Sequence, residues 1–354
     1  MVSRGFAKRA VAVSGLRRVR NPILLAKAML EHGEDDLLGH RYRQVHVGLD
    51  VPSAQGHTLL HGETAEVLAE RYGLELVDPK YFFTQQRWDE HVRGLERERS
   101  GLGVASWSDV EYLPQGTVGA VVLDADGVVC CATSTGGLTN KLTGRIGDTP
   151  TVGAGFWAEE WIEQGHRLAT APAVGLSDGL AGLLADCLPS LSLQTYSPIP
   201  SESGLATTRS VAVSGTGNGD SFLRTAAART VGSIARFAGL PSAVALTRVT
   251  GPDGELQRSA GDRWGKTGEG EGGIIGIECI VVSDPNGNVV ETRSEIIQDY
   301  NCGGMFRAWI DEKGSAWARV WRADGAVPCQ YVGEDKPEDP RIWCSEKLGG
   351  FLAS

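Results

Sequence analysis

Residues 116–135 read Gly-Thr-Val-Gly-Ala-Val-Val-Leu-Asp-Ala-Asp-Gly-Val-Val-Cys-Cys-Ala-Thr-Ser-Thr, and this stretch decides the fold of the second half of the chain. Two runs rich in β-branched residues flank the turn sequence Asp124-Ala-Asp-Gly127. Such runs on either side of a D-x-D-G turn predict a β-hairpin, with strands over 117–123 and 128–133.

The predicted hairpin also fixes which side chains stand opposite one another. If the turn has four residues, Leu123 pairs with Val128 and Thr117 pairs with Ser134. Thr135 then returns beside Thr117, so two threonine hydroxyls are expected to meet at the open end of the hairpin.

The residues before the hairpin have a different pattern. Apolar residues at helical spacing predict three helices, over 16–36, 61–72 and 81–95. The stretch 40–57 has no clear period and is predicted to be a loop, and the aperiodic stretch 100–115 is predicted to be an exposed linker. A helical first part is therefore joined by a linker to a β-rich second part.

Beyond the hairpin, helices and strands alternate with glycine-rich segments. We predict a structured loop over 135–160, helices over 173–187 and 221–237, a flexible segment over 187–208, strands over 211–215, 273–282 and 288–294, a strand pair within 302–322 and a polar, acidic tail from 327. This order predicts an α+β fold with antiparallel sheets.

Composition excludes several classes of protein. The chain has 354 residues, 41% hydrophobic and 22% charged, and its net charge of -10 argues against nucleic acid as a partner, because phosphate binding needs a basic surface. No apolar run approaches the roughly 18 residues of a membrane span, and no long apolar region follows the basic start as in a signal peptide. The seven cysteines form no C-x-x-C pair and no Asn-x-Ser/Thr sequon occurs. These two observations predict a cytoplasmic protein without a structural metal site.

The histidines narrow the possible chemistry. Six of the seven precede residue 92, and only His166 lies beyond it. A Ser-His or Cys-His enzyme would have to take its base from these residues. The early histidines share no helical spacing, so we expect them to be surface or packing residues.

The glycine-rich loop Gly215-Thr-Gly-Asn-Gly-Asp220 lies between a predicted strand and a predicted helix. It lacks the spacing of a dinucleotide-binding loop, but backbone N–H groups in this position can hold a carboxylate or an oxyanion. A tight turn without a ligand is the alternative. Trp264-Gly-Lys-Thr267 matches a P-loop only in part, because Ala260 stands where that motif requires glycine.

A cation and an anion stand three residues apart in Gly144-Arg-Ile-Gly-Asp148. A fixed guanidinium at Arg145 and a fixed carboxylate at Asp148 can bind the α-carboxylate and the α-amino group of one amino acid. The alternative is an ordinary surface ion pair.

Several glycine- and threonine-rich motifs follow one another in a fixed order. They are Gly116-Thr-Val-Gly119, Thr133-Ser-Thr-Gly-Gly137, Asn140-Lys141, Gly144-Arg-Ile-Gly-Asp-Thr-Pro150, Gly153-Ala-Gly155 and Gly215-Thr-Gly-Asn-Gly219, preceded by Val19-Arg-Asn-Pro22 and Leu60-His-Gly-Glu63. The combination resembles the N-terminal-nucleophile (Ntn) hydrolase family of plant-type asparaginases, also called isoaspartyl peptidases. The resemblance covers residues 8–95 and 112–310, with insertions over 40–57 and 187–208.

The resemblance implies a four-layer αββα sandwich and autocatalytic cleavage between Gly116 and Thr117. Cleavage would divide the chain into an α-subunit portion, 1–116, and a β-subunit, 117–354, which begins with the catalytic threonine. A homodimer of processed αβ units is expected, which hydrolyses the side-chain amide of L-asparagine or β-aspartyl (isoaspartyl) peptides without a cofactor. The new α-amino group, with a pKa of roughly 7.7–8.0, can act as the base for its own hydroxyl, so no histidine is needed.

By the same resemblance, each site residue has an expected role. Thr117 is the nucleophile and Thr135 orients it. The residues expected to contact the substrate are Arg145, Ile146, Gly147, Asp148, Thr216, Gly217, Asn218 and Gly219. Among them, Arg145 binds the α-carboxylate and Asp148 the α-amino group. The Thr216 side chain and the Gly217 N–H form the oxyanion hole.

Two sister families remain as alternatives. Glycosylasparaginase shares Thr216-Gly-Asn-Gly-Asp220, but its hairpin motifs differ and it enters the secretory pathway. Taspase, which cleaves proteins, is similar at Trp157-Ala-Glu159 but lacks an aspartate at the position of Asp148. The intact pair of Arg145 and Asp148 favours a small, amino-acid-like substrate.

The chain departs from the family at the start of the pattern. The family begins with a strand, a His-Gly-Gly loop and a helix, and none of these is read before Arg17. The resemblance therefore implies a sandwich that is incomplete at its N-terminus and has an unpaired strand edge. An inactive remnant without turnover is a further alternative.

Overall fold

The structure, a computed structural model, describes residues 2–4, 6–35, 56–101, 116–163, 204–311, 314–322 and 342–350. The expected helix over 173–187 lies outside these residues, as do most of the three expected segments 40–57, 100–115 and 187–208.

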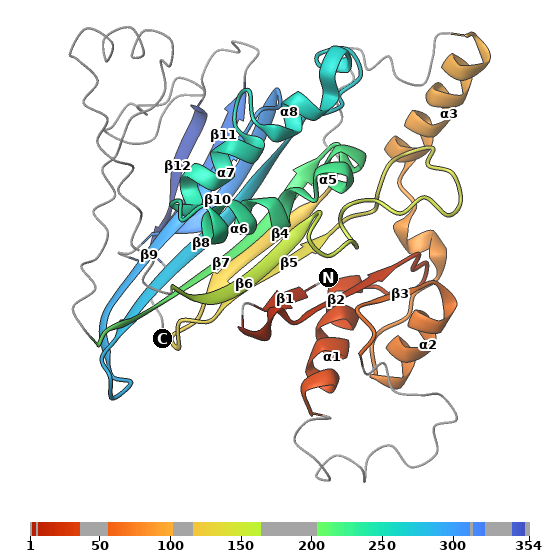
Figure 1. The fold of residues 1–354 in the computed structure, drawn as a ribbon. Coiled ribbons are helices and arrows are strands. Elements are labelled where there is room, and N and C mark those ends of the chain that lie inside the picture. The colour runs from red at the N-terminus through yellow and green to blue at the C-terminus, as the bar shows by residue number, and fades with distance from the viewer. Residues whose placement is uncertain are drawn as a thin grey trace, which may run out of the picture.

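The described strands form three sheets (Figure 1). The five-stranded sheet has the order β3-β2-β1-β5-β4 and consists of β1 (Val2–Arg4), β2 (Ala10–Ser14), β3 (Leu59–His61), β4 (Val118–Leu123) and β5 (Val129–Ser134). The four-stranded sheet is antiparallel and runs β6 (Phe156–Glu163), β7 (Ala206–Gly217), β8 (Gly272–Ser283) and β9 (Val289–Tyr300). The three-stranded sheet consists of β10 (Gly304–Ile310), β11 (Ser315–Arg322) and β12 (Ile342–Gly350), so part of the expected tail is a strand.

The described helices fall into two groups along the chain. Before the hairpin stand α1 (Pro22–Asp35), α2 (Glu63–Arg71) and α3 (Gln85–Arg99), with short 3-10 turns at Phe6–Lys8 and Pro79–Phe82. After β7 follow α5 (Gly219–Thr225), α6 (Ala227–Phe237), α7 (Ser242–Thr250) and α8 (Glu255–Ala260), then a 3-10 turn at Gly261–Arg263. The prediction of a mixed α+β fold is confirmed. Within the described ranges, every helix is too short or too polar to cross a membrane.

The hairpin of β4 and β5 is confirmed, but its register differs by one residue from the prediction. Leu123 pairs with Val129 rather than Val128. The turn is longer because the Asp124 carboxylate accepts hydrogen bonds from the backbone N–H groups of Asp126 (3.0 Å) and Val128 (2.8 Å). Since Val118 pairs with Ser134, the next position along each strand brings Thr117 opposite Thr135.

The expectation that no strand precedes Arg17 is wrong. β1 pairs with β5, and β2 lies inside the five-stranded sheet between β1 and β3. The side chains of Val11, Ala12 and Val13 in β2 are buried. The first segment of the chain therefore contributes core strands to the sheet that carries the hairpin.

Other element boundaries also differ from the predictions. Within the range 16–36 expected for the first helix, α1 begins at Pro22, and Val19 before it forms a β-bridge with Leu76. The predicted helix over 221–237 is two helices, α5 and α6, broken at Ala226, whose φ is 44°. α7 and α8 had no counterpart in the sequence prediction.

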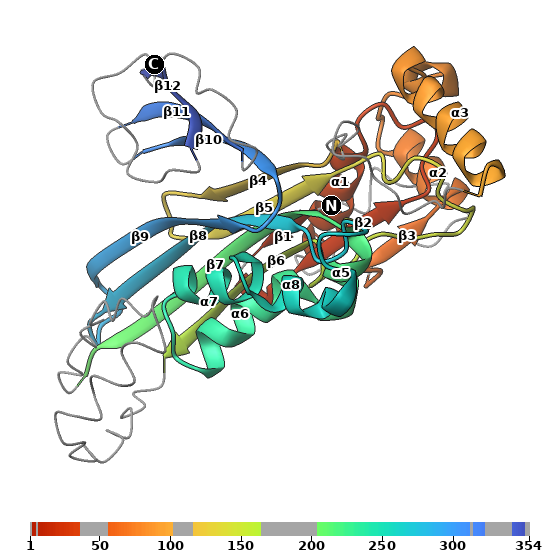
Figure 2. The ribbon, with the colours of Figure 1, turned by 90° about the horizontal axis from the view of Figure 1, so that it is seen from above.

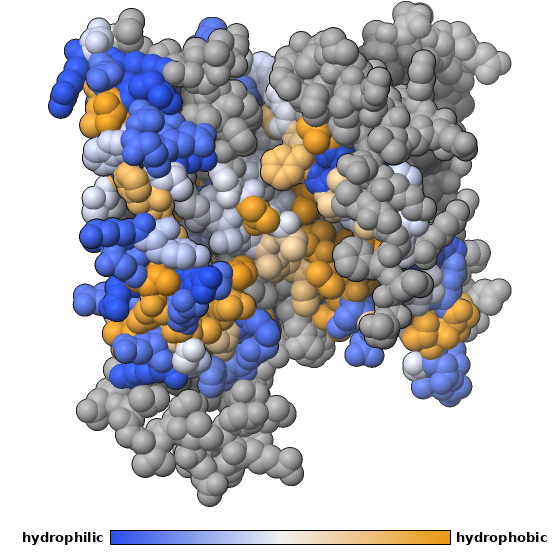
Figure 3. Space-filling view, turned by 180° about the vertical axis from the view of Figure 1, so that it is seen from behind, coloured by the Kyte–Doolittle hydropathy of each residue, from blue (hydrophilic) through white to orange (hydrophobic). Residues whose placement is uncertain are grey.

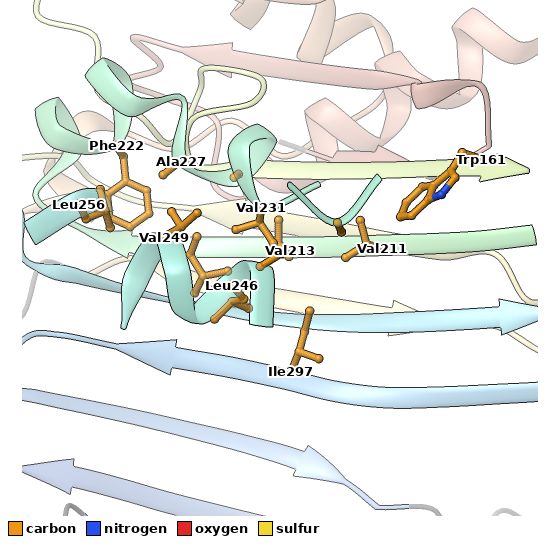
Figure 4. Packing of buried hydrophobic residues seen from close by; sticks show 14 residues of the cluster. Trp161, Val211, Val213, Phe222, Ala227, Val231, Leu246, Val249, Leu256 and Ile297 are labelled. Carbon is orange, nitrogen blue, oxygen red and sulfur yellow. The ribbon is translucent and has the colours of Figure 1, made fainter. Parts of the chain in front are cut away.

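Apolar side chains fill three separate layers of the molecule. The helices α5–α8 pack on one face of the four-stranded sheet (Figures 1 and 2), around Phe222, Leu246 and neighbouring residues (Figure 4). A second cluster, with Ala12, Phe156 and Ala212, joins the five-stranded and four-stranded sheets. A third cluster places α1 and α2 against β2, and full burial of one large apolar side chain in such a cluster contributes about 1.5–3 kcal/mol.

The outer face of β4 is apolar and open to solvent. Its outward-facing residues Val118 and Val122 are 68% and 56% exposed, and β4 is the edge strand of its sheet within the described part of the chain. Figure 3, which shows the molecule from behind, has apolar side chains gathered near the centre of the view. The β4 edge of the five-stranded sheet, next to Thr117, is therefore more exposed to solvent than the centre of this sheet.

Candidate active site

A cavity of about 130 Å³ opens at the end of the hairpin where Thr117 lies. Its walls come from the end of β2, the end of β5 and the loop that follows β5. The lining residues include Ser14, Thr117, Thr133, Thr135, Gly137, Lys141, Arg145, Ile146, Gly147 and Asp148. Hydroxyl and charged groups from segments far apart in the sequence thus share one small space.

Hydroxyl groups form one wall of this cavity. Thr117 Oγ1 donates a hydrogen bond of 3.0 Å to Thr135 Oγ1, which also accepts one of 3.1 Å from the Gly137 N–H. The buried Thr133 hydroxyl is hydrogen-bonded to Ser214 of β7 at 2.6 Å. A side chain at position 119 would collide with that serine, because a Cβ on Gly119 would lie 2.1 Å from Ser214 Oγ. Close contact between the two sheets therefore holds Thr117 and Thr135 in place.

Charged groups form the other wall. Asp148 is only 7% exposed, and this burial raises the pKa of its carboxyl group to about 6, while nearby backbone N–H groups and Arg145 favour the ionised form. The Arg145 guanidinium donates a hydrogen bond of 3.1 Å to Asp220 in the first turn of α5. A Cβ on Gly219 would lie 2.5 Å from the Asp148 carboxylate and 3.0 Å from the Arg145 guanidinium, so a side chain at this position would displace these groups. The ion pair of Arg145 in the described part of the chain is therefore with Asp220 and not with Asp148.

Backbone hydrogen bonds fix the loop that carries Asp148. The Asp148 carbonyl accepts from the N–H groups of Thr151 (2.8 Å) and Gly155 (3.2 Å). The same loop is tied to α6, because the Arg229 N–H donates to the Gly153 carbonyl at 2.7 Å. It is tied to β7 by a bond of 2.8 Å from the Gly215 N–H to the Gly155 carbonyl. The Asp148 carboxylate therefore has a defined position before any substrate arrives.

Four of the eight expected substrate-binding residues, Arg145 to Asp148, line this cavity, and a fifth, Gly219, lies against Asp148 and Arg145. Thr216 and Gly217 are at the end of β7, two and three residues after Ser214, and pair with Gly273 and Gly272 of β8. They are not among the lining residues, and their role in an oxyanion hole remains a prediction. The Asn218 side chain accepts hydrogen bonds from the N–H (3.0 Å) and hydroxyl (2.8 Å) of Ser221, so it caps α5.

Three residues of the site were not assigned a role from the sequence. Asp220 binds the Arg145 guanidinium, Lys141 lies at the rim of the cavity, and the Ser14 hydroxyl, which also lines it, is 3.0 Å from His61 Nδ1. Asp220 could have been noticed from its position in the glycine-rich loop, and Lys141 from the Asn-Lys motif. Nothing in the local sequence indicates that Ser14 lines the same cavity as Thr117.

The taspase-like segment lies away from the cavity. Glu159 is fully buried on β6 and accepts hydrogen bonds from Arg229 (2.7 Å) and Arg236 (3.3 Å) of α6. The Arg229 guanidinium lies over the ring of Trp157, 4.7 Å from its centroid. These residues pack a helix on the four-stranded sheet and are not among the residues that line the cavity.

Comparisons with known proteins agree with these motifs. Residues 43–163 match the model of a family described as asparaginase. The chain is 30% identical over 321 residues to an isoaspartyl peptidase of Escherichia coli (strain K12), covering 91% of this chain and 71% of that protein. It is 29% identical over 305 residues to an isoaspartyl peptidase of Salmonella typhimurium, covering 86% and 67%. A plant-type L-asparaginase of Pyrobaculum calidifontis is 36% identical over 160 residues, covering 45% of this chain and 44% of that protein.

Proposed function

The chain belongs to the asparaginase family, and we propose that it is a threonine amidohydrolase that cleaves the side-chain amide of L-asparagine and of β-aspartyl peptides. One observation carries the proposal. The hydroxyl of Thr117, hydrogen-bonded to Thr135, shares a cavity of about 130 Å³ with the opposed charges of Arg145 and Asp148. A nucleophile and the two groups that recognise an amino acid are therefore held within reach of one small molecule.

We propose that Thr117 becomes a chain terminus by autocatalytic cleavage after Gly116. Its free α-amino group, with a pKa of roughly 7.7–8.0, then removes the proton of its own hydroxyl. Thr117 Oγ1 attacks the amide carbon, ammonia or an amine leaves, and water hydrolyses the resulting ester to release aspartate. Thr135, which already accepts a hydrogen bond from Thr117 at 3.0 Å, keeps the attacking oxygen in position.

In this proposal the charged wall binds the α-ammonium and α-carboxylate groups of the substrate. Asp148, ionised above its pKa of about 6, holds the α-ammonium group. Arg145 exchanges its hydrogen bond to Asp220 for two to the α-carboxylate, which matches a guanidinium better than an ammonium. Thr216 and the Gly217 N–H, at the end of β7, stabilise the oxyanion.

The proposal extends to the architecture. The three apolar clusters support the four-layer αββα arrangement, with two sheets between two layers of helices. Cleavage would separate 1–116 from 117–354, and the pairing of β1 with β5 would keep both pieces in one sheet. We propose further that processed αβ units form a homodimer. The buried thiols of Cys131 and Cys279, neither of which is in a disulfide, support a reducing, cytoplasmic location.

A hydrolysis assay tests the proposed function. Purified chain is incubated with L-asparagine and with β-Asp-Leu, and the release of aspartate is measured. Thr117→Ala is expected to lower the rate by at least about 10⁴-fold, because it removes the nucleophile. Thr292→Ala, at an exposed position on β9, is the matched control and is expected to keep the activity. Turnover by Thr117→Ala at the rate of the unchanged chain would refute the assignment.

A further inference from the structure

Lys141 lies at the rim of the cavity, where the proposed function gives it no task. Its side chain is exposed while Asp148 is buried, so the two residues mark the open and the closed end of the same space. Lys141 Nζ donates hydrogen bonds to the carbonyl oxygens of Gly136 (2.9 Å) and Leu138 (3.4 Å). In the part of the chain that the structure describes, no acidic side chain lies within ion-pair distance of this ammonium group.

The cavity is lined by one more charged side chain than a simple amino acid needs. The charged lining residues are Lys141, Arg145 and Asp148, and Asp220, which is hydrogen-bonded to Arg145, is not among the lining residues. L-asparagine carries one carboxylate and one ammonium group, which Arg145 and Asp148 satisfy. The ammonium group of Lys141 remains, and a second carboxylate on the substrate would give it a partner of opposite charge.

We propose that Lys141 binds the α-carboxylate of the residue that leaves when a β-aspartyl dipeptide is cleaved. The inference rests on the proposed function, since it concerns the substrate of the same site. It assigns to Lys141 the choice between a β-aspartyl dipeptide with a free C-terminal carboxylate and a substrate that lacks one.

The geometry fits a carboxylate one residue beyond the scissile bond. Lys141 Nζ is hydrogen-bonded to Gly136, the residue after Thr135, and Thr135 holds the nucleophile Thr117. One residue of extended chain spans at most about 3.6 Å, so the carboxylate of the leaving residue stays near the nucleophile. From there it would point out of the small cavity toward its exposed rim, which is where the lysine ammonium lies.

A purely structural role for Lys141 makes a different prediction. If the lysine only ties the turn of residues 136–138 together, its loss disturbs Thr135 and slows every substrate alike. If Lys141 binds the carboxylate of the leaving residue, its loss lowers kcat/KM only for substrates that carry this carboxylate. The ratio of two specificity constants therefore separates recognition from structure.

The test compares kcat/KM for β-Asp-Leu and for β-Asp-leucinamide, in which the leaving carboxylate is blocked. We expect the unchanged chain to prefer β-Asp-Leu about tenfold, as for one hydrogen bond to a charged group. Lys141→Met is expected to bring this ratio close to one, and Lys141→Arg, which keeps the charge, to preserve most of it. Lys27→Met, at an exposed lysine of α1 that does not line the cavity, is expected to leave the ratio unchanged.

Each outcome has a defined meaning. The role of Lys141 is overturned if the unchanged chain has equal kcat/KM values for β-Asp-Leu and β-Asp-leucinamide. It is also overturned if Lys141→Met lowers both kcat/KM values by the same factor. Turnover of L-asparagine in the same preparation shows that the proposed function stands in that case. Absence of turnover with all three substrates, in chain shown to be folded by circular dichroism, overturns the proposed function and the role of Lys141 with it.

Discussion

The two walls of the cavity are built in different ways. The hydroxyl wall (Thr117, Thr133 and Thr135) belongs to the ends of adjacent strands, and the contact between the sheets fixes it. The charged wall (Arg145 and Asp148) belongs to a loop, which contacts to α5, α6 and β7 fix from outside. This difference predicts that the two walls have separate roles in catalysis. Changes to the hydroxyl wall should alter the chemical step, kcat, and changes to the charged wall should alter substrate binding, KM.

The largest effect short of removing the nucleophile is expected on the hydroxyl wall. Thr135→Val keeps the shape of the side chain but removes the oxygen that accepts the hydrogen bond from Thr117. We expect kcat for L-asparagine to fall about 10²-fold with little change in KM, since one positioned polar group typically contributes this much. Thr139→Val, at an exposed position in the following turn, is the control. A rise in KM without a loss of kcat would show that the hydroxyl wall contributes to substrate binding and not to the chemical step.

On the charged wall, Arg145→Lys is expected to raise KM about 30-fold with little change in kcat. A lysine keeps the positive charge but cannot make two parallel hydrogen bonds to a carboxylate. Steady-state kinetics with L-asparagine measures both constants. Arg224→Lys, in an ion pair with Glu269 of the turn before β8, is the matched control. If Arg145→Lys lowered kcat alone, the division between the two walls would fail.

The pH dependence of binding tests Asp148. Its pKa is raised to about 6 by burial, so the carboxylate is mostly ionised at pH 7 and about one-tenth ionised at pH 5. Because the ionised form holds the α-ammonium group, the affinity for the product L-aspartate should fall about tenfold from pH 7 to pH 5. Calorimetry on Thr117→Ala measures this affinity without turnover. Asp148→Asn in that background should bind weakly at both pH values, and an equal pH response in both variants would remove Asp148 from recognition.

The smallest effect is expected from Glu159, which supports the charged wall from a distance. The Glu159 carboxylate accepts a hydrogen bond of 2.7 Å from the Arg229 guanidinium. The backbone N–H of Arg229 donates to the carbonyl of Gly153, which belongs to the loop that carries Asp148. Glu159→Gln is expected to raise KM about threefold at unchanged kcat, in addition to the about 3–5 kcal/mol of stability that a broken buried ion pair costs.

Glu278→Gln is the matched control for that experiment. Glu278 is also buried in the four-stranded sheet and pairs with Arg209, but it contacts Ser242 at the start of α7 instead of the loop that carries Asp148. Thermal unfolding should show a similar loss of stability for both variants. If both variants changed KM equally, the effect of Glu159 would be a general loss of packing.

The sequence predicted the parts of the site that depend on neighbouring residues. The hairpin and the meeting of Thr117 with Thr135 follow from strand runs on either side of a turn. The register differed by one residue because the side chain of Asp124 lengthens the turn, a hydrogen-bonding detail that strand patterns do not contain. The motif order indicated the family, and the comparisons confirmed it.

Contacts between distant segments were not predictable in this way. Arg145 and Asp220 are 75 residues apart, and their hydrogen bond depends on how α5 leaves β7. The strand β2 is only five residues long and follows a basic start, so it was not recognised, although it lies inside the five-stranded sheet. Short elements whose stability comes from tertiary packing carry a weak local signal.

The central claim is that Thr117 is a nucleophile that becomes a chain terminus, and the intact mass of the purified protein tests it most directly. After incubation, the unchanged chain should give two masses, for 1–116 and 117–354, while Thr117→Ala should give only the full chain. Thr292→Ala should be cleaved like the unchanged chain. An unchanged chain that hydrolyses L-asparagine while remaining in one piece would contradict the claim, as would a break elsewhere that Thr117→Ala does not prevent.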